Sequence, residues 1–224
     1  MKNTMMEGTR KKRASVIVNT LKRLYPTIKP SLNSSNTFEF LVAVILSAQC
    51  TDARVNIVTK NLFQKYRTVQ DYVNASIGEF EQDIRSTGFY RNKAKNILAT
   101  AKIIHEKYDD TVPKTMNEML ELPGVARKTA NVVLGYKYGV VEGVAVDTHV
   151  RRLSNIYGLT TEQNPDKIET DLMKSLPPCE WIEFTMRMVE YGRQYCPAKK
   201  HDHKNCPIYI ALRKEKLIPE DRLQ

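Results

Sequence analysis

Apolar and polar residues alternate along most of this 224-residue chain with the period of an amphipathic helix. In segments 93–108 and 53–66 the apolar side chains recur mostly every three or four positions, so each segment presents one apolar stripe. The stripe residues are Ala94, Ile97, Leu98, Ala101, Ile104 and Tyr108 in the first segment and Val55, Val58, Leu62 and Tyr66 in the second. Both segments are predicted to be helices that pack one face against a core.

Residues that favour helix ends predict further helices. Asp147 is a good N-cap and Gly158 suits the position just after a helix, so a helix is expected between them. Pro165 fits a first helical turn, and Pro177 stops the helix that begins there. Residues 180–192 carry another amphipathic pattern that closes on a glycine. The predicted fold class is all-α, with roughly nine or ten helices joined by short loops.

One stretch, GVVEGVAV at 139–146, has the β-branched composition of a strand. No second comparable strand is available to pair with it, so we interpret it as an extended connection between helices. The length allows one large domain or two small ones. No Gly/Ser linker marks a boundary, so two domains would share a tight interface.

The charge balance points to an anionic partner. Lys plus Arg number 35 and Asp plus Glu 25, a formal net charge of +10. Nucleic acid is the commonest partner of such a chain, and an anionic membrane surface is the second possibility. No apolar run approaches a membrane span, and the N-terminal stretch lacks the apolar core of a secretion signal. Four widely spaced cysteines favour a reducing cytosol, so we expect a cytoplasmic protein.

The stretch LPGVARKTANVV, residues 122–133, places a sharp turn directly before a helix. Pro123 presets φ and Gly124 supplies a backbone geometry that other residues resist. The first amides of the following helix are then available to an anion, and Arg127 and Lys128 add full charge there. The turn is therefore a candidate phosphate site; the alternative is an ordinary helical corner with solvated cations.

Five segments together resemble the endonuclease III family of helix-hairpin-helix DNA glycosylases, and they occur in family order. They are FEFLVAVILSAQCTD (38–52), GFYRNKAKNI (88–97), LPGVARKTANVVL (122–134), VDTHVRRL (146–153) and YGRQYC (191–196). The resemblance implies two all-helical domains with a DNA-binding cleft between them. Residues 30–140 would form a six-helix barrel that carries the helix-hairpin-helix, and residues 1–29 would join 141–224 in the second domain.

The same resemblance assigns the chemistry. Lys128 matches the family's catalytic amine, which attacks C1′ of the target nucleotide, expels the base and forms a Schiff base. The helix N-terminus and Arg127 are expected to disfavour its ammonium form. Asp147 matches the carboxylate that activates the lysine and steadies the developing cation. The alternatives are a surface lysine on phosphate for Lys128 and a plain helix cap for Asp147.

The resemblance also assigns DNA contacts. Gln49 would plug the hole left by a flipped base, and Phe89, where a leucine is expected, would act as an apolar wedge; alternatively, Gln49 caps a helix turn and Phe89 is core. The remaining DNA-binding candidates are Arg91, Lys93, Leu122, Gly124, Ala126, Arg127, His149, Arg151, Arg193, Lys199 and Lys200. Ala126 stands where a second hairpin glycine is often found. Each charged candidate could instead be a solvated surface charge.

The family's C-x6-C-x2-C-x5-C array, which holds a [4Fe–4S] cluster, is incomplete in this chain. That spacing falls on Cys196, His203, Cys206 and Leu212, so two thiolates are missing. We therefore expect no standard cluster and no cofactor, with the loop kept as a DNA contact. Zinc held by Cys196, His201, His203 and Cys206 is the open alternative, although the spacing is not a standard zinc motif.

The function that the resemblance implies is that of a base-excision repair DNA glycosylase and AP lyase. It would remove oxidised pyrimidines from damaged double-stranded DNA, as a monomer associated with the nucleoid. Alternatives are a non-catalytic helix-hairpin-helix DNA-binding protein and a mismatch-specific glycosylase. An amine at Lys128 favours lyase activity, and LVAVILSAQC (41–50) lacks the acid that an adenine glycosylase needs.

Overall fold

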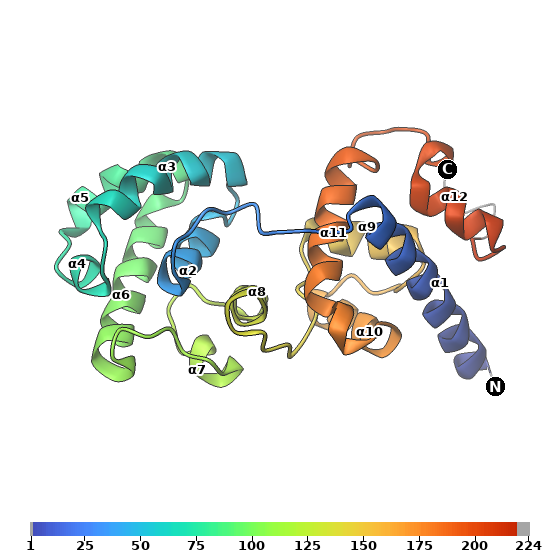
Figure 1. Cartoon of the computed structure of the whole chain (residues 1–224), viewed down its shortest axis with the longest axis horizontal. Coiled ribbons are helices and arrows are strands. Elements are labelled where there is room, and N and C mark those ends of the chain that lie inside the picture. The colour runs from blue at the N-terminus through green and yellow to red at the C-terminus, as the bar shows by residue number, and fades with distance from the viewer. Residues whose placement is uncertain (1, 219–224) are drawn as a thin grey trace. The chain divides into compact units, whose positions relative to one another are not determined.

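The structure, a computed structural model, describes residues 2–218, with the backbone alone for residues 2–6. Two units divide the chain. One, the 30–142 unit, comprises Pro30–Glu142, and the other, the terminal unit, joins Met1–Lys29 to Gly143–Gln224 (Figure 1). Throughout residues 2–218 the regular elements are helices, without a strand, so the predicted all-α class is confirmed.

The 30–142 unit is built around a buried helix. It contains α2 (Thr37–Leu46), α3 (Asp52–Lys65), α4 (Val69–Val73), α5 (Ile77–Ile84), α6 (Tyr90–Tyr108), α7 (Met116–Leu120) and α8 (Arg127–Tyr138). Helix α2 is apolar on almost every side and is contacted by α3, α6 and α8, as expected of a helix enclosed by its neighbours. Helix α6 packs its apolar stripe against α4 and α5.

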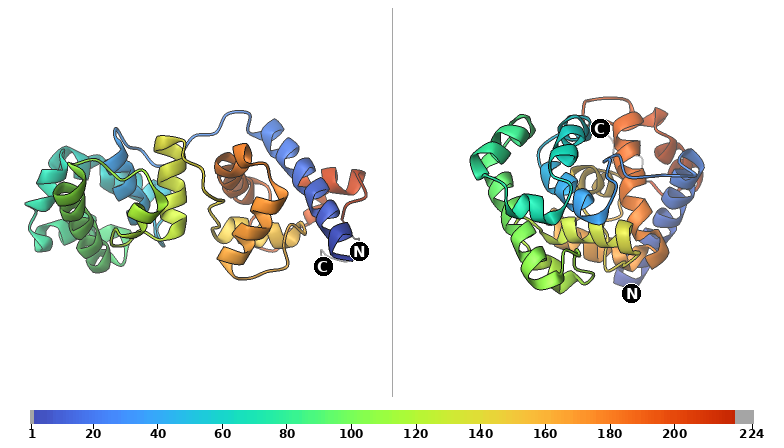
Figure 2. Two further views of the ribbon diagram at one scale, coloured as in Figure 1. Left: turned by 90° about the horizontal axis from the view of Figure 1, so that it is seen from below. Right: turned by 60° about the vertical axis from the view of Figure 1, so that its left-hand side comes forward.

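The terminal unit has its own core. It contains α1 (Lys2–Leu24), α9 (Thr148–Ile156), α10 (Pro165–Ser175), α11 (Trp181–Gln194) and α12 (Pro207–Lys214). Helix α1 contacts α10, α11 and α12, and Figure 2 shows it running beside them although it comes from the other end of the sequence. Helix α9 packs on α11, and the rings of Tyr157 and Tyr191 meet edge to face between them.

The helix boundaries follow the local signals with few differences. Asp147 caps α9, Gly158 has the positive φ expected after a helix, and Pro165 begins α10. The extended connection predicted at 139–146 is confirmed. Twelve α-helices occur within residues 2–218, more than expected, because α4 and α7 have only five residues each and are too short to show a period. Helix α11 continues past Gly192 to Gln194.

None of the helices in the described part of the chain is both long and apolar enough to span a membrane.

Candidate functional site

The turn at Pro123 and Gly124 joins α7 to α8 as a helical hairpin. Gly124 has φ +78°, a conformation that side-chain-bearing residues rarely adopt. A Cβ at this position would also lie 2.9 Å from the side chain of Asn96 on α6. Thr100, one helical turn further along α6, donates a hydrogen bond of 2.9 Å to the carbonyl of Pro123. Glycine is therefore required at the turn both for its backbone angle and for the close approach of α6.

The start of α8 presents its amides without a capping side chain. Its N-cap is Ala126, and no side chain in the described part of the chain accepts a hydrogen bond in the manner of a cap there. Because Ala126 has φ −91°, the position does not need a glycine. Lys128, the second residue of α8, is exposed, whereas the side chain of Leu122 is buried in the core. The hairpin thus combines available amides with an exposed amine.

Arg127 turns toward its own unit. Its guanidinium reaches the carbonyl of Glu142 at 3.5 Å, the outer limit of a hydrogen bond, and the side chain is half-buried. This contact brings the start of α8 near the connection that leaves its end.

Asp147 is held in place by its capping bond. Its Oδ1 accepts a hydrogen bond of 2.7 Å from the amide of Val150, so the predicted cap is confirmed. Asp147 belongs to the terminal unit and Lys128 to the 30–142 unit. A cap fixes where a carboxylate points, which is compatible with a second, chemical role.

The cations of the terminal unit differ in their surroundings. His149 on α9 is half-buried, and a Cβ on Gly192 of α11 would lie 2.5 Å from its Nδ1, so glycine allows the two helices to approach. Arg151 is exposed on the same helix. Arg193 is exposed and forms an ion pair of 3.8 Å with Glu190. These side chains remain candidates for phosphate contacts.

Gln49 and Phe89 share an uncommon backbone conformation. Their φ angles are +53° and +48°, in the left-handed region that few non-glycine residues occupy. Both residues are exposed, and Phe89 is 64% accessible despite its apolar side chain. The alternative of a core role for Phe89 is therefore wrong. Strained backbone that presents exposed side chains is typical of functional positions.

Lys93 is the one phosphate candidate that the structure contradicts. It is only 5% exposed, and its Nζ donates to the carbonyl oxygens of Leu46 and Thr87 at 2.8 Å each. A lysine with both bonds inside the core cannot reach a DNA backbone. The burial of Lys93 could not be predicted from the sequence, because Lys93 lies between the exposed residues Arg91 and Lys95. A lysine in such a charged run is ordinarily solvated.

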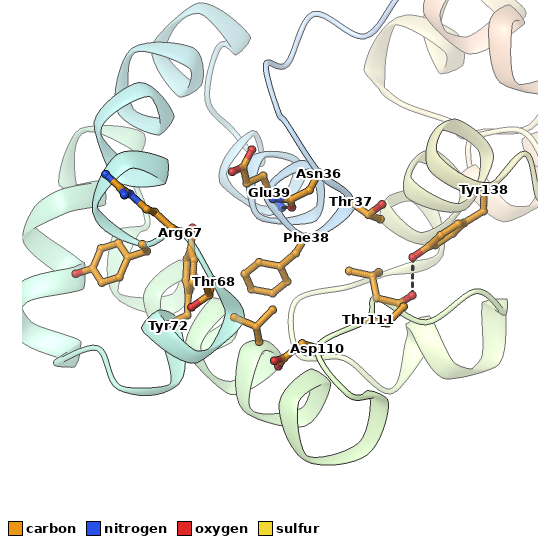
Figure 3. Close-up of a pocket in the computed structure, with 13 residues that line it drawn as sticks. Asn36, Thr37, Phe38, Glu39, Arg67, Thr68, Tyr72, Asp110, Thr111 and Tyr138 are labelled. Carbon is orange, nitrogen blue, oxygen red and sulfur yellow. Dashed lines mark hydrogen bonds between the residues drawn. The ribbon is translucent and has the colours of Figure 1, made fainter.

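A hollow of the 30–142 unit lies elsewhere. It opens between the start of α2, α4 and the loop after α6, and its walls include the rings of Phe38, Tyr72 and Tyr138 (Figure 3). The hydroxyl of Tyr138 donates a 2.6 Å bond to the carbonyl of Val112 at one side. None of the side chains predicted to carry chemistry lines this hollow, so we assign it no part in the site.

Two cysteines and two histidines converge in the loop between α11 and α12. The ligand atoms of Cys196, His201, His203 and Cys206 all lie within 4.8 Å of one another, so the group could hold a metal ion. Both thiols are free and buried, and both imidazoles are half-buried. Burial raises the pKa of the Cys206 thiol, and it lowers the pKa of His203. Lys199 and Lys200 are exposed in the same loop.

This group does not fit a [4Fe–4S] cluster. Such a cluster needs four ligands on four different irons, which keeps the ligand atoms well apart. Here Leu212, at the fourth position, is fully buried in apolar packing, and the four polar ligand atoms crowd around one point. The residues present therefore do not build the cluster site that the family spacing describes.

Comparison with known proteins identifies the relatives of this fold. The HhH-GPD superfamily base excision DNA repair protein family matches residues 42–178. Endonuclease III of Synechocystis sp. is 50% identical over 193 residues, which cover 86% of this chain and 88% of the relative. Endonuclease III of Bacillus subtilis is 44% identical over 191 residues, covering 85% and 87%.

Solved structures agree with the sequence relatives. A non-covalent Endonuclease III–DNA complex superposes with a TM-score of 0.85 at 43% identity and covers 92% of this chain and 96% of its own. A trapped Endonuclease III–DNA covalent intermediate gives a TM-score of 0.85 at 42% identity, covering 93% and 99%. These relatives agree with the all-helical fold and with the hairpin in which an exposed lysine follows the glycine turn. The chain therefore belongs to the endonuclease III family of helix-hairpin-helix DNA glycosylases.

Proposed function

We propose that Lys128 is the nucleophile with which this base-excision repair glycosylase and AP lyase removes oxidised pyrimidines from double-stranded DNA. The observation that carries the proposal is its place: an exposed amine on the first turn of a helix that no described side chain caps. A phosphate bound to those amides would hold the deoxyribose of the same strand beside the amine. The turn lies against α6, where Thr100 bonds the carbonyl of Pro123 and Asn96 approaches Gly124 closely.

The reaction needs an amine that becomes bonded to sugar. The lone pair of the neutral Lys128 amine attacks C1′, and the glycosidic bond breaks with its electrons going to the base, which takes up a proton. Opening of the sugar ring then gives a Schiff base between Nζ and C1′. Removal of a C2′ proton expels the 3′ phosphate by β-elimination, which nicks the strand, and hydrolysis of the Schiff base frees the enzyme.

Asp147 supplies the negative charge in this proposal. A carboxylate stabilises the cation that develops on the sugar as the base leaves, and it can accept a proton from the amine. Its bond to the amide of Val150 fixes one carboxylate oxygen, so the group is oriented before substrate arrives. Preorganisation of this kind lowers the reorganisation needed in the transition state.

Access to the base requires that it leave the duplex. Gln49 would fill the vacated space and Phe89 would stack on the orphaned base. Both residues are exposed, and each has a left-handed backbone conformation. The phosphate contacts that we retain position the chain without reading sequence. They are the hairpin at Gly124 to Arg127 and the side chains of Arg91, His149, Arg151, Arg193, Lys199 and Lys200. We expect a monomer to act on nucleoid DNA.

Borohydride trapping on abasic duplex DNA tests the nucleophile. Reduction of the Schiff base should leave the wild-type chain covalently bound to DNA, and Lys128→Gln should abolish the adduct. The matched control is Lys102→Gln, which removes another exposed lysine, one that pairs with Glu106 on the outside of α6. The control should trap like wild type. Oxidised pyrimidine duplexes should be cleaved by wild type and not by Lys128→Gln.

Three results would contradict parts of the proposal. An undiminished adduct in Lys128→Gln would place the nucleophile on another amine. Wild-type protein that binds abasic DNA but never forms an adduct would favour the non-catalytic alternative. Excision confined to normal bases in mismatches, with oxidised pyrimidines untouched, would overturn the substrate class and leave the nucleophile in place.

A further inference from the structure

The loop between α11 and α12 contains a complete set of ligands for a single ion. We propose that Cys196, His201, His203 and Cys206 bind one structural zinc ion, in a site that takes the place of the family's iron–sulfur cluster. Zinc favours four-coordinate tetrahedral sites made of thiolates and imidazoles. The four residues lie in a segment of eleven residues, 196–206, which ends directly before α12. Binding of one ion would therefore close a short loop.

The distances agree with one tetrahedral centre. Zinc bonds of about 2.3 Å to sulfur and about 2.0–2.1 Å to nitrogen place neighbouring S and N ligand atoms about 3.5 Å apart. Cys196 Sγ lies 3.5 Å from His203 Nδ1, and Cys206 Sγ lies 3.4 Å from His201 Nε2 and 4.0 Å from His203 Nδ1. The ligand set therefore needs only small adjustments to enclose one ion.

The hydrogen-bond pattern around His201 prepares it as a ligand. Its Nδ1 lies 2.8 Å from the carbonyl of Lys199, which can only accept, so Nδ1 carries the proton. In the neutral ring Nε2 then has a free lone pair, and this is the atom that faces Cys206. Metal-binding histidines characteristically donate their other ring N–H to a carbonyl or carboxylate in this manner.

Hydrogen bonds alone do not satisfy the group. The single S–H of Cys206 faces the carbonyl of Tyr195 at 3.2 Å as well as the acceptor nitrogen of His201 at 3.4 Å. One proton cannot serve both acceptors. If zinc replaces this proton, the sulfur becomes a ligand of the ion beside Nε2 of His201, and the Tyr195 carbonyl, which loses its donor, has to turn away from the thiolate.

The charge balance suits a buried position. Two thiolates neutralise the two charges of Zn²⁺, the imidazoles bind as neutral ligands, and the two thiol protons pass to solvent. Arg152 stands beside the site: its guanidinium donates to the carbonyl of Cys196 at 2.6 Å and approaches the Cys196 sulfur at 3.9 Å. A cation near a bound thiolate stabilises it, and its bond to the backbone holds the loop.

Metal content is the direct test. Full-length protein, purified under reducing conditions without chelator from zinc-supplemented cells, should contain about one zinc per chain with no iron or sulfide. Cys206→Ser and the milder His201→Asn should each lose it. The matched controls are Cys179→Ser and His105→Ala, since the first is an exposed cysteine and the second an exposed histidine bound to Asp110, both outside the group. Both controls should keep the ion.

Cobalt substitution gives a second readout that is independent of activity. Co²⁺ exchanged into the wild-type chain should show the visible bands of a tetrahedral site and thiolate-to-cobalt charge transfer. Circular dichroism checks that each variant keeps its helices. His201→Asn replaces a half-buried side chain in the loop, so we expect this variant to keep the protein core intact. Any of four results would overturn the proposal. They are a zinc content well below half an equivalent after dialysis against zinc, bound iron with sulfide, a disulfide between Cys196 and Cys206, and zinc retained in both variants.

One consequence rests on the proposed function. Because the His201 ring bonds the backbone of Lys199, zinc would fix the loop that carries Lys199 and Lys200 toward DNA. Removing zinc with a chelator should weaken binding to abasic DNA several-fold and lower the Tm. If zinc is present but DNA affinity does not change on its removal, the loop's DNA contact is wrong and the zinc site stands. If trapping at Lys128 fails, the zinc measurements are unaffected.

Discussion

The ammonium nitrogen of Lys93 lies 2.8 Å from the carbonyl oxygen of Thr87. An equal bond of 2.8 Å joins it to Leu46, the last residue of α2. Leu46 stands three residues before Gln49, and Thr87 stands two residues before Phe89. One buried side chain thus connects the two turns that carry the proposed base-flipping residues, and we propose that Lys93 positions both.

Lys93→Met should therefore lower both stability and base excision. The substitution keeps the apolar stem but leaves two buried carbonyls without their donor, which costs about 1–3 kcal/mol of unfolding free energy. Urea denaturation measures the loss. Lys95→Met, an exposed neighbour on α6, is the control and should be close to neutral. Equal stability in the two variants would show that the buried bonds contribute nothing.

The same variant separates positioning from simple destabilisation. In the proposed mechanism, excision from paired duplex needs Gln49 and Phe89 in place, whereas lyase action on single-stranded abasic DNA has no vacated stack to fill. We expect Lys93→Met to reduce the first activity more than the second at a temperature where it is fully folded. A uniform reduction of both activities would assign Lys93 a structural role alone.

Asp147 can be tested by separating its cap from its charge. Asparagine caps a helix about as well as aspartate, so Asp147→Asn should keep the Tm of wild type. Asp147→Ala should lose about 1 kcal/mol because the amide of Val150 loses its acceptor. Borohydride trapping should slow strongly in both variants, since neither has a carboxylate. Wild-type trapping rates in Asp147→Asn would reduce the residue to a helix cap.

Phe89→Gly should raise the stability of the protein and lower its base-excision activity. Glycine relieves the strain of the left-handed backbone by about 1 kcal/mol, and little packing is lost because Phe89 is 64% exposed. Excision from duplex DNA should fall as the wedge disappears. Asp109→Gly is the matched control, because Asp109 also has a positive φ, +47°, but ends α6 at a distance in sequence from the wedge. It should gain stability with unchanged activity.

Gly124→Ala should disturb the hairpin. Its φ of +78° and the 2.9 Å approach of Asn96 each oppose a Cβ, so we expect a loss of about 1–3 kcal/mol and weaker binding to abasic DNA. Gly78→Ala on α5 provides the comparison, since its Cβ would meet open space, and it should be neutral or mildly stabilising. Thermal denaturation with abasic-duplex titration measures both. A Gly124→Ala protein as stable as Gly78→Ala would mean that the turn can relax.

Local signals in the sequence were sufficient for much of the fold. The stripe of α6, the cap at Asp147 and the proline that begins α10 act over one or two helical turns, so their residues reveal them directly. The left-handed turn at Gly124 was likewise readable from the glycine itself. The short helices α4 and α7 were missed because five residues do not establish a period.

The candidate site was only partly readable. Lys128 and Asp147 are proposed from their motifs, whereas the burial of Lys93 depends on Leu46, 47 residues earlier in the chain. Nothing in α6 indicates that Asn96 and Thr100 support the hairpin, because each is an ordinary polar residue in a helix. The irregular spacing of Cys196, His201, His203 and Cys206 argued against a metal site, yet the folded loop brings their ligand atoms together.

The sequence by itself determined the all-helical class, most helix ends, the glycine turn before Lys128 and the membership of a family, because each depends on neighbouring residues or on motifs kept in order. Tertiary structure alone decided which lysine is buried, which apolar ring stays exposed and which four ligands meet. Those outcomes depend on how segments far apart in the chain pack, and packing is set by the shapes and polar groups of many residues together.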